Sequence, residues 1–359
     1  MPYPPNYGGI IDVYYKIKAL HSLGFKIILH CFQYGRAEQD ILNNYCEKVF
    51  YYERKLNPFK LFSKKPFIAS TRNHPQLLQN LLLDTNPILF EGLHTCFFLN
   101  HPALSQRYKI VRMHNIEWQY YEGLSKGEQS IIKKKYFQME IQKLIKMEEQ
   151  LQFADKILTI SEKDQSYYNT KYPNKSVLVN GFHQNEDIEP ISDSQPFCLY
   201  HGNLSVNENQ QAALFLIDTF KDTKIKICFA GKNPPSLLKS SINQYSHFSL
   251  IESPSEEVIN DLIKRAQINL LPFMIKAGAK IKLLNALYMG KFIISNQPAS
   301  IHDFSALIIE ANTKEDWIEK TNYYLNLPFN EIELNKRKSI LYEKYNNLNN
   351  AKTIAYLLP

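Results

Sequence analysis

Histidine, amide and carboxylate side chains follow a predicted β-strand in the first half of the chain. The run His114-Asn115-Ile116-Glu117 comes directly after the strand predicted at residues 110–113. These side chains at the end of a strand are suited to holding sugar hydroxyls or to acting near a leaving group. A similar but less pronounced cluster, Glu91-Gly92-Leu93-His94, follows the strand predicted at residues 87–90. A purely structural role for either histidine is the alternative interpretation.

Small and basic residues precede predicted helices, which is typical of phosphate binding. Gly8-Gly9 stands before a helix predicted at residues 10–22, where bare N–H groups can face an anion with no Cβ in the way. The loop at residues 272–282 leads into a second predicted helix and contains Gly278, Ala279, Lys280 and Lys282. Two lysines beside a helix N-terminus form a cradle for a diphosphate. Ordinary turns and solvated lysines are the competing interpretation.

Two segments in the second half of the chain leave predicted strands in the same way. Gly202-Asn203 follows the strand predicted at residues 197–201 and leads to a helix near Asn207, and Gly231-Lys232 follows the strand predicted at residues 224–230. Ligands of open parallel sheets gather at the carboxyl ends of the strands. We therefore expect all of these polar segments at the ligand-binding edges of their sheets.

Several motifs of nucleotide and metal sites are absent from the sequence. It contains no G-x-G, no G-x-x-x-x-G-K-[ST] and no G-x-S-x-G. It also contains no D-x-D and no C-x-x-C, and His94 and His101 have no partner at a convincing metal-ligand spacing. We therefore expect no metal site, so that helix dipoles and lysines must neutralise the phosphates of any bound nucleotide sugar.

Composition excludes several classes of protein. The 359 residues are 44% hydrophobic and include only 12 Gly, which excludes disordered and collagen-like chains and suits two domains. No apolar run approaches the roughly 20 residues that span a bilayer, and the first residues do not resemble a signal peptide. The chain has 5 Cys, of which Cys31, Cys198 and Cys228 lie in apolar, strand-like runs. These features predict reduced core thiols in a cytoplasmic protein.

The excess of positive charge belongs to the first half of the chain. The formal net charge of +7 divides into +6 for residues 1–187 and +1 for residues 188–359. A basic half fits an anionic membrane surface, a phosphorylated substrate or nucleic acid, and also a merely soluble surface. We expect no nucleic-acid partner, because no basic and aromatic motif lies on a predicted helix or sheet face.

Short β-branched runs alternate with amphipathic segments along the whole chain. Such alternation predicts an α/β protein with parallel sheets that are covered by helices on both faces. The clearest predicted helix spans residues 127–153. The predicted strands are Lys26–Phe32, Lys48–Tyr52, Pro87–Phe90, Tyr108–Met113, Lys156–Ile160, Ser176–Val179, Phe197–His201, Lys224–Ala230, Phe248–Ile251, Ile268–Leu271, Phe292–Ser295 and Leu307–Ile309.

Two such series in succession predict two doubly wound, Rossmann-like domains that face each other across a cleft. We place them at residues 1–187 and 188–359, with the boundary in the polar stretch at residues 185–194. The last predicted helix, at residues 331–346, could pack on either domain. The first domain opens on a loop-like Tyr3-Pro4-Pro5-Asn6-Tyr7-Gly8-Gly9 in place of a buried strand, and we expect that a first strand lies upstream of Met1.

The order and spacing of these segments resemble a GT-B glycosyltransferase, close to the retaining family-four type, or glycosyl transferases group 1. The resemblance covers nearly the whole chain. Its marks are Pro4-Pro5-Asn6-Tyr7-Gly8-Gly9, His114-Asn115-Ile116-Glu117, Ala154 to Ser161, Val179-Asn180-Gly181-Phe182, Tyr200-His201-Gly202-Asn203-Leu204, Phe229-Ala230-Gly231-Lys232, Leu271-Pro272 through Gly278, Lys282 to Leu287 and Gly290-Lys291.

This resemblance implies a role for each segment. His114 would contact the donor sugar, Lys280 or Lys282 would hold the diphosphate, and Asn285 would reach the ribose. The Gly8-Gly9 loop would face the donor phosphates and the acceptor, with Gly202, Asn203, Lys232, Gly278 and Ala279 also on the donor side. Glu91, His94, Asn115 and Glu117 would lie on the acceptor side, in the first domain.

The chain departs from the family pattern at its charged positions. The paired glutamates of the family, eight positions apart, fall on Ala277 and Asn285, and the usual basic residue of the donor site is replaced near Asn203 and Asn207. Lys232 stands at another family position and can compensate for the missing basic residue.

A retaining transfer needs no protein nucleophile, because the leaving diphosphate can deprotonate the incoming hydroxyl while dipoles and lysines stabilise the charge of the diphosphate.

The resemblance thus predicts a cytoplasmic hexosyltransferase with no cofactor beyond its nucleotide-diphosphate sugar. Its partners would be that sugar and a glycan or lipid-linked acceptor. Residues 57–67 interleave aromatics with Lys60, Lys64 and Lys65, and Lys133-Lys134-Lys135 adds to the charge, which suggests contact with an anionic membrane. Two alternatives stay open: a catalytically impaired GT-B binding subunit, and an inverting GT-B enzyme with Glu91, His94 or Glu117 as its base.

Overall fold

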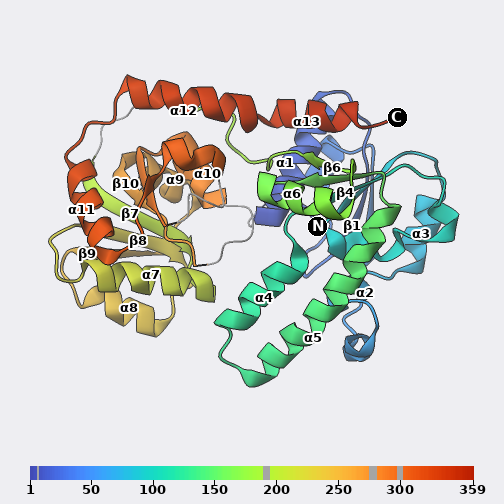
Figure 1. The fold of residues 1–359 in the computed structure, drawn as a ribbon, viewed down its shortest axis with the longest axis horizontal. Coiled ribbons are helices and arrows are strands. Elements are labelled where there is room, and N and C mark those ends of the chain that lie inside the picture. Colours follow the sequence, from blue (N-terminus) through green and yellow to red (C-terminus); the bar gives the residue numbers. More distant parts are fainter. Residues whose placement is uncertain (6–7, 189–194, 275–280, 297–301) are drawn as a thin grey trace. The chain divides into compact units, whose positions relative to one another are not determined.

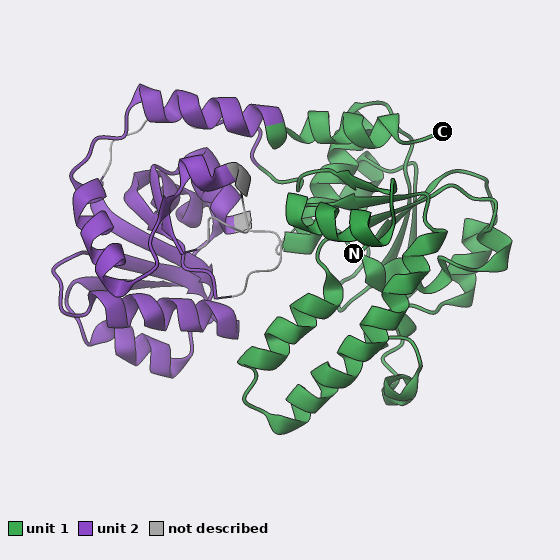
Figure 2. Cartoon of the chain, viewed as in Figure 1, with its two compact units in different colours: residues 1–184, 277–279, 344–359 green, residues 185–276, 280–343 purple. Residues whose placement is uncertain are grey.

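The computed structural model divides the chain into two compact units (Figure 2). It describes residues 1–5, 8–188, 195–274, 281–296 and 302–359. Unit 1 contains residues 1–184 together with 344–359, and unit 2 contains the described residues between 185 and 343. These bounds differ from the predicted ranges 1–187 and 188–359, because the last helix packs its Ala351 and Ile354 into the core of unit 1.

Unit 1 contains parallel strands in two sheets. The four-stranded sheet has the order β3-β4-β5-β6, and β1 pairs only with β2. No strand precedes α1 among the described residues. The strands are β1 (Ile28–Gln33), β2 (Lys48–Glu53), β3 (Ile88–Glu91), β4 (Lys109–Met113), β5 (Lys156–Thr159) and β6 (Ser176–Leu178).

Helices bury both faces of the four-stranded sheet (Figure 1). Val111 and Ile157 pack against α5 and α6 on one face, whereas Ile110 and Leu158 pack against α1 and α13 on the other. This alternation follows from the two-residue period of a strand. The helices are α1 (Gly8–Ser22), α2 (Phe67–Ser70), α3 (Pro75–Leu81), α4 (Glu117–Gly127), α5 (Ile131–Glu148), α6 (Glu162–Lys171) and α13 (Asn347–Tyr356).

The prediction of a single helix at residues 127–153 is wrong at its N-terminal end. The structure has two antiparallel helices there, α4 and α5, which lie side by side (Figure 1) and are joined by an edge-on contact between the rings of Tyr121 and Phe137. The helical conformation is interrupted at residues 128–130. Ser130 caps the N-terminus of α5, and the Ser130 N–H donates to the Glu128 carboxylate at 2.9 Å. At the other end α5 continues as a 3₁₀ turn, Glu149–Phe153.

Unit 2 has one six-stranded parallel sheet with the order β12-β11-β10-β7-β8-β9. This is the doubly wound order, which reverses direction between β7 and β10 and leaves a ligand-binding switch point there. The strands are β7 (Gln195–Asn203), β8 (Ile227–Lys232), β9 (Phe248–Glu252), β10 (Ala266–Leu270), β11 (Phe292–Ser295) and β12 (Ile309–Glu310).

The sheet of unit 2 is also covered on both faces. Tyr200 and Phe229 face a core shared with α7, α8 and α11, and Leu199 and Cys228 face the opposite core with α9. The helices are α7 (Asn207–Phe220), α8 (Ser236–Asn243), α9 (Glu256–Arg265), α10 (Ile281–Met289), α11 (Lys314–Leu325) and α12 (Glu331–Lys344). Further 3₁₀ turns lie at Asp40–Asn44, Pro58–Phe62, Leu93–Phe98, Pro102–Leu104 and His302–Leu307.

The predicted α/β architecture is confirmed strand by strand. Each predicted strand coincides with one of β1 to β12, although several ends shift by a few residues. Helices α4 and α13 were not predicted as separate elements. All five cysteines are buried free thiols. None of the helices in the described ranges is long and apolar enough to cross a membrane.

Gly231 fixes the close approach of β7 and β8. A Cβ at this position would lie 2.0 Å from the Gly202 carbonyl oxygen, which is backbone and cannot move aside. We expect Gly231→Ala to lower the free energy of unfolding by about 2 kcal/mol or more. Urea unfolding measures this effect. Gly127→Ala is the matched control, since a Cβ there meets no atom within 4 Å, and an equal effect of both changes would contradict this account.

Candidate functional site

Five charged or ionisable side chains gather at the carboxyl ends of β3 and β4 in unit 1. Two of them stand four residues apart on α1, one ends β3, one lies within β4, and one follows β4. Spacing by four places the α1 pair on one face of the helix. We call this group the Asp12 cluster; its members are Asp12, Lys16, Glu91, Arg112 and His114.

The fully buried Arg112 guanidinium holds the Asp12 carboxylate with two hydrogen bonds. Its Nη2 donates to Asp12 Oδ1 at 2.8 Å, and its Nε donates to Asp12 Oδ2 at 3.2 Å. The remaining donors of Arg112 bind the carbonyl oxygens of Thr159, Val179 and Asn180. Burial of this ion pair is tolerated because each of its charged atoms meets a partner.

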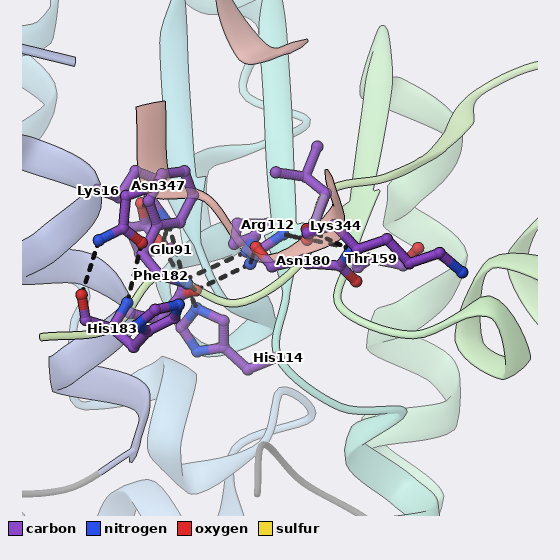
Figure 3. A network of polar contacts seen from close by, with 12 residues as sticks. Lys16, Glu91, Arg112, His114, Thr159, Asn180, Phe182, His183, Lys344 and Asn347 are labelled. Carbon is purple, nitrogen blue, oxygen red and sulfur yellow. Dashed lines mark hydrogen bonds and ion pairs between the residues drawn. The ribbon is translucent and has the colours of Figure 1, made fainter. Parts of the chain in front are cut away.

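Lys16 joins both carboxylates of the cluster. Its Nζ lies 3.0 Å from Asp12 Oδ2 and 2.9 Å from Glu91 Oε2, and its side chain is almost fully buried (Figure 3). Although burial opposes ionisation, Arg112 and Lys16 hold the pKa of Asp12 well below its usual range. Burial likewise opposes the charge on Glu91, and Lys16 and His114 nevertheless lower the pKa of that carboxyl.

His114 lies against the two carboxylates. Its Nε2 is 3.3 Å from Asp12 Oδ2 and 3.5 Å from Glu91 Oε2. Burial favours the neutral imidazole, but these contacts outweigh it and raise the pKa of His114. The opposite ring edge faces the start of α1, where a Cβ on Gly9 would lie 3.5 Å from Nδ1. The cluster therefore favours the protonated form of an imidazole that lies beside the first turn of a helix.

The spacing of Asp12, Glu91 and His114 alone would suit a metal ion, because one ligand atom from each lies within 4.8 Å of the others. The same carboxylate oxygens, however, already contact the fixed cations Lys16 and Arg112. With His114 protonated the cluster carries three positive and two negative charges, so a divalent cation would meet net repulsion. The absence of a metal stays a prediction.

Hydrogen bonds extend from the Asp12 cluster to the segments where the chain passes between the units. Arg112 donates to the Asn180 carbonyl at 3.1 Å, and Asn180 Nδ2 donates to the Lys344 carbonyl at 2.8 Å. His183 and Asn347 exchange two hydrogen bonds, at 3.1 and 2.7 Å (Figure 3). The segment that leaves unit 1 and the one that returns to it are thus bound to each other and to the cluster.

Two further acceptor-side candidates, Glu117 and His94, differ in the direction of their pKa shifts. Burial raises the pKa of Glu117 to about 7, although His114 opposes this shift. Burial lowers the pKa of His94 well below its ordinary value, with help from Arg72 and His114. His94 lies close to the turn at Gly92, whose φ of +81° and whose Cβ position 2.7 Å from the His94 ring both require glycine.

In unit 2 the candidate site centres on Lys282, in the first turn of α10. Its Nζ donates to Asn209 Oδ1 at 2.8 Å and lies 5.3 Å from the centre of the Tyr200 ring. Asn209 belongs to the first turn of α7, and its Nδ2 donates to the Asn203 carbonyl at 2.8 Å. The ammonium group therefore lies where β7 ends and α7 begins, at the switch point of the sheet.

The end of β7 leaves room for the side chain of Asn209, which binds Lys282. Gly202 leaves room for Asn209, since a Cβ there would lie 3.2 Å from Asn209 Cγ. Asn203 and Lys232 are register partners at the ends of β7 and β8, and both are exposed. Burial and Lys282 lower the pKa of His201 to about 3, so this imidazole is neutral at physiological pH.

The remaining predicted residues divide into three groups. Asn285 lies on α10, and its Oδ1 accepts a hydrogen bond from Asn185 Nδ2 at 3.0 Å. Gly8 and Gly9 lie in the first turn of α1. The side-chain oxygen of Asn115 is buried and has no hydrogen-bond partner in the described part of the chain. Gly278, Ala279 and Lys280 lie outside the described residues.

The sequence interpretation missed Asp12, Lys16, Arg112 and Asn209. Two signals for them existed. Asp12 and Lys16 occupy the apolar face of the predicted helix at residues 10–22, and Arg112 interrupts the apolar strand at residues 108–113. A charged residue at a core position requires a partner, so these positions indicate buried ion pairs without identifying the partner of each residue.

Three comparisons place this chain among known proteins. Residues 195–326 match the sequence model of the glycosyl transferases group 1. A 44.6 kDa protein from the cps region of Klebsiella pneumoniae is 26% identical over 320 residues, which are 83% of this chain and 81% of that protein. The match to group 1 confirms, for this part of the chain, the resemblance that the motifs predicted.

Solved structures confirm the predicted fold class. HepE of Anabaena, in complex with UDP and glucose, superposes with a TM-score of 0.65 at 10% identity, over 96% of this chain and 95% of that one. A glycosyltransferase of Rickettsia africae gives a TM-score of 0.63 at 13% identity, over 97% and 94%. Both cover nearly all of each chain, and the fold is that of the GT-B glycosyltransferases.

Removing the carboxylate of Asp12 tests the buried ion pair. Asp12→Asn leaves the cations of Arg112 and Lys16 buried with less compensation, so we expect the free energy of unfolding to fall by about 3 to 5 kcal/mol. Denaturant unfolding measures this loss. The control is Asp218→Asn, which breaks exposed ion pairs with Lys221 and Lys314 and should leave the midpoint nearly unchanged. A similar effect of both changes would contradict the role of burial.

The raised pKa of His114 predicts a pH dependence of stability. The folded state binds this proton more tightly than the unfolded chain does. The resulting stabilisation is fully present below the ordinary pKa of about 6.5 and is lost as the pH rises through the folded value. Between pH 6 and 9 the unfolding free energy of the wild type should therefore fall more steeply than that of His114→Gln. Parallel slopes would refute this prediction.

Proposed function

We propose that the protein is a glycosyltransferase that moves a hexose from a nucleotide-diphosphate sugar to a glycan or lipid-linked acceptor, with retention and without a metal ion. The observation that carries the proposal is the position of Lys282 Nζ between the first turns of α7 and α10 at the switch point of unit 2. The group 1 match covers α7 and α10, and HepE of Anabaena, which has the same fold, was crystallised with UDP and glucose.

In this proposal the diphosphate is bound by backbone dipoles and ammonium groups. The N-termini of α7 and α10 carry partial positive charge, and Lys282 adds a full charge beside them. Lys232 lies at the end of the neighbouring strand β8, with its side chain exposed. The positive charge of these groups would neutralise the two phosphates.

The chemical step needs no nucleophile from the protein. The bond between sugar C1 and the diphosphate oxygen breaks, and the acceptor oxygen bonds to C1 on the same face. The acceptor proton passes to the leaving phosphate oxygen. We assign stabilisation of the developing phosphate charge to Lys282, and a hydrogen bond from the cationic His114 to a sugar hydroxyl. Asp12 and Glu91 position His114 and favour its protonated form by raising its pKa.

The biological setting of the proposal is polysaccharide biosynthesis in the cytoplasm. The relative from the cps region of Klebsiella pneumoniae supports the first part. The five buried free thiols support a reducing compartment, because buried cysteines that are not paired suit cytoplasmic proteins.

An inverting transfer is the second candidate, and Glu117 favours it. Its pKa of about 7 lets this carboxyl accept a proton near neutral pH, as a general base for an acceptor hydroxyl would. Analysis of the product anomer separates the two reactions. Retention with unchanged rates in Glu117→Gln would exclude the base role, and inversion would replace the mechanism above.

Lys282→Ala tests the diphosphate site. A thermal-shift panel of UDP-, GDP- and ADP-sugars first identifies the donor, because a specific ligand stabilises the folded state by mass action. With that donor, Lys282→Ala should lower kcat by about a hundredfold or more, because it removes charge stabilisation in the transition state. The melting temperature should change little.

Two outcomes would contradict the proposed function. Unchanged kinetics in Lys282→Ala would remove the diphosphate assignment, with the exposed Lys336→Ala as the control that must stay active. A folded wild type that binds none of the sugar nucleotides in calorimetry would favour a non-catalytic GT-B binding subunit. Activity in the presence of EDTA tests the predicted independence of metal.

A further inference from the structure

Two segments of unit 1 expose large apolar side chains together with lysines. One is the loop around the 3₁₀ turn Pro58–Phe62, and the other is the first turn of α5. Phe62, Ile132 and Phe59 are 86%, 82% and 79% exposed. We call the whole set the apolar-lysine patch; its members are Leu56, Phe59, Phe62, Ile131 and Ile132 with Lys55, Lys64, Lys133, Lys134 and Lys135.

The loop holds its aromatic side chains outward through polar contacts of its own. Asn57 Oδ1 accepts from the Phe59 N–H at 2.9 Å, Lys60 Nζ donates to the Ser70 carbonyl at 2.9 Å, and Lys65 Nζ donates to the Phe97 carbonyl at 2.9 Å. The exposure of the aromatic rings is thus built into the fold. The same contacts correct the expectation that Lys60, Lys64 and Lys65 all face a membrane. Lys60 and Lys65 donate hydrogen bonds to backbone carbonyls, and only Lys64 of the three is exposed.

The two segments lie on the same side of unit 1. Lys143 Nζ donates to the Leu61 carbonyl at 2.6 Å, and Glu140 Oε2 accepts from the Phe67 N–H at 2.6 Å, so the loop rests on α5 (Figure 1). Ile132 precedes Lys143 by eleven residues, or close to three helical turns, and therefore projects from the same face of α5. Ile132 therefore lies on the face of α5 that carries the loop, about 16 Å along the helix axis from Lys143.

We propose that the apolar-lysine patch docks unit 1 onto the surface of an anionic lipid bilayer. Aromatic and aliphatic side chains enter the boundary between headgroups and acyl chains, and the flanking lysines pair with lipid phosphates. The charge of the patch supports this occupant: it contributes five lysines. Glu128, 4.0 Å from Lys133, already accepts the Ser130 N–H.

The distribution of charge along the chain agrees with this occupant. Residues 1–187 carry +6 of the net charge of +7. Large apolar side chains that are exposed together with polar residues on one side of a domain are typical of an interaction site. The proposal does not depend on the transferase activity, although a lipid-linked acceptor would be presented at the same surface.

Flotation with vesicles tests the patch. The wild type should float with vesicles of phosphatidylcholine mixed with phosphatidylglycerol, and not with phosphatidylcholine alone, since the lysines require anionic headgroups. Phe59→Ser with Phe62→Ser should reduce the bound fraction about fivefold or more, because it removes the inserted area. Lys133→Gln, Lys134→Gln and Lys135→Gln together should reduce it as strongly at physiological salt.

Matched controls come from unit 2. Leu237 and Ile332 are both 76% exposed, so Leu237→Ser with Ile332→Ser removes two strongly exposed apolar side chains elsewhere. Lys224→Gln, Lys226→Gln and Lys336→Gln remove three exposed lysines. Both controls should float like the wild type. Circular dichroism and the melting temperature check that every variant is folded.

A second readout reports insertion directly. The emission of Phe62→Trp should shift to shorter wavelength on addition of the anionic vesicles, whereas Leu237→Trp should not respond. Equal flotation of patch and control variants, or no flotation of the folded wild type, would overturn the proposal. So would a dimer in light scattering that the Phe59 and Phe62 changes abolish without any vesicle binding, since a second copy would then be the occupant.

Discussion

The buried ion pair between Arg112 and Asp12 is the constraint on which unit 1 depends. Burying two charges is costly, and this cost is offset only while every donor and acceptor keeps a partner. Arg112 meets that condition by binding Asp12 and three backbone carbonyls. Asp12 meets the same condition through Arg112 and Lys16, and through a hydrogen bond that its Oδ1 accepts from the Phe182 N–H at 2.9 Å. Satisfying the charges fixes α1, β4 and residues 179–182 relative to one another.

The position and charge of His114 follow from that constraint. The imidazole contacts the same Asp12 carboxylate, so its ring orientation is set by groups that cannot move without exposing a buried charge. Gly9 completes the arrangement by letting the start of α1 approach the ring. A charge preorganised in this way can stabilise a ligand without reorganisation during a reaction. The same hydrogen bonds continue to the two segments that connect unit 1 with unit 2.

Unit 2 has a different arrangement of charge at its proposed diphosphate site. The paired glutamates of the family fall on Ala277 and Asn285, and asparagines stand near the usual basic position. Lys282 lies among Asn209, Tyr200 and Phe273. Asparagines cannot supply charge, but they orient the ammonium group and leave helix N-termini unobstructed. The charged groups of the two units therefore differ: unit 1 holds a compensated ion cluster around His114, and unit 2 has Lys282 beside the first turns of two helices.

Local patterning in the sequence determined the strands, the α/β class and the segments at strand ends, because the alternation of apolar residues depends on neighbours only a few positions away. It also indicated His114, Glu117 and Lys282. Tertiary structure alone decided that Asp12, Lys16 and Arg112 meet, since 100 residues separate Asp12 from Arg112 and a charged residue carries no mark of its partner. It likewise decided that Lys60 and Lys65 donate hydrogen bonds to backbone carbonyls while Lys64 stays exposed. The return of residues 344–359 to unit 1 was also decided by tertiary structure. Such pairings depend on which elements pack together, and a linear pattern does not contain that information.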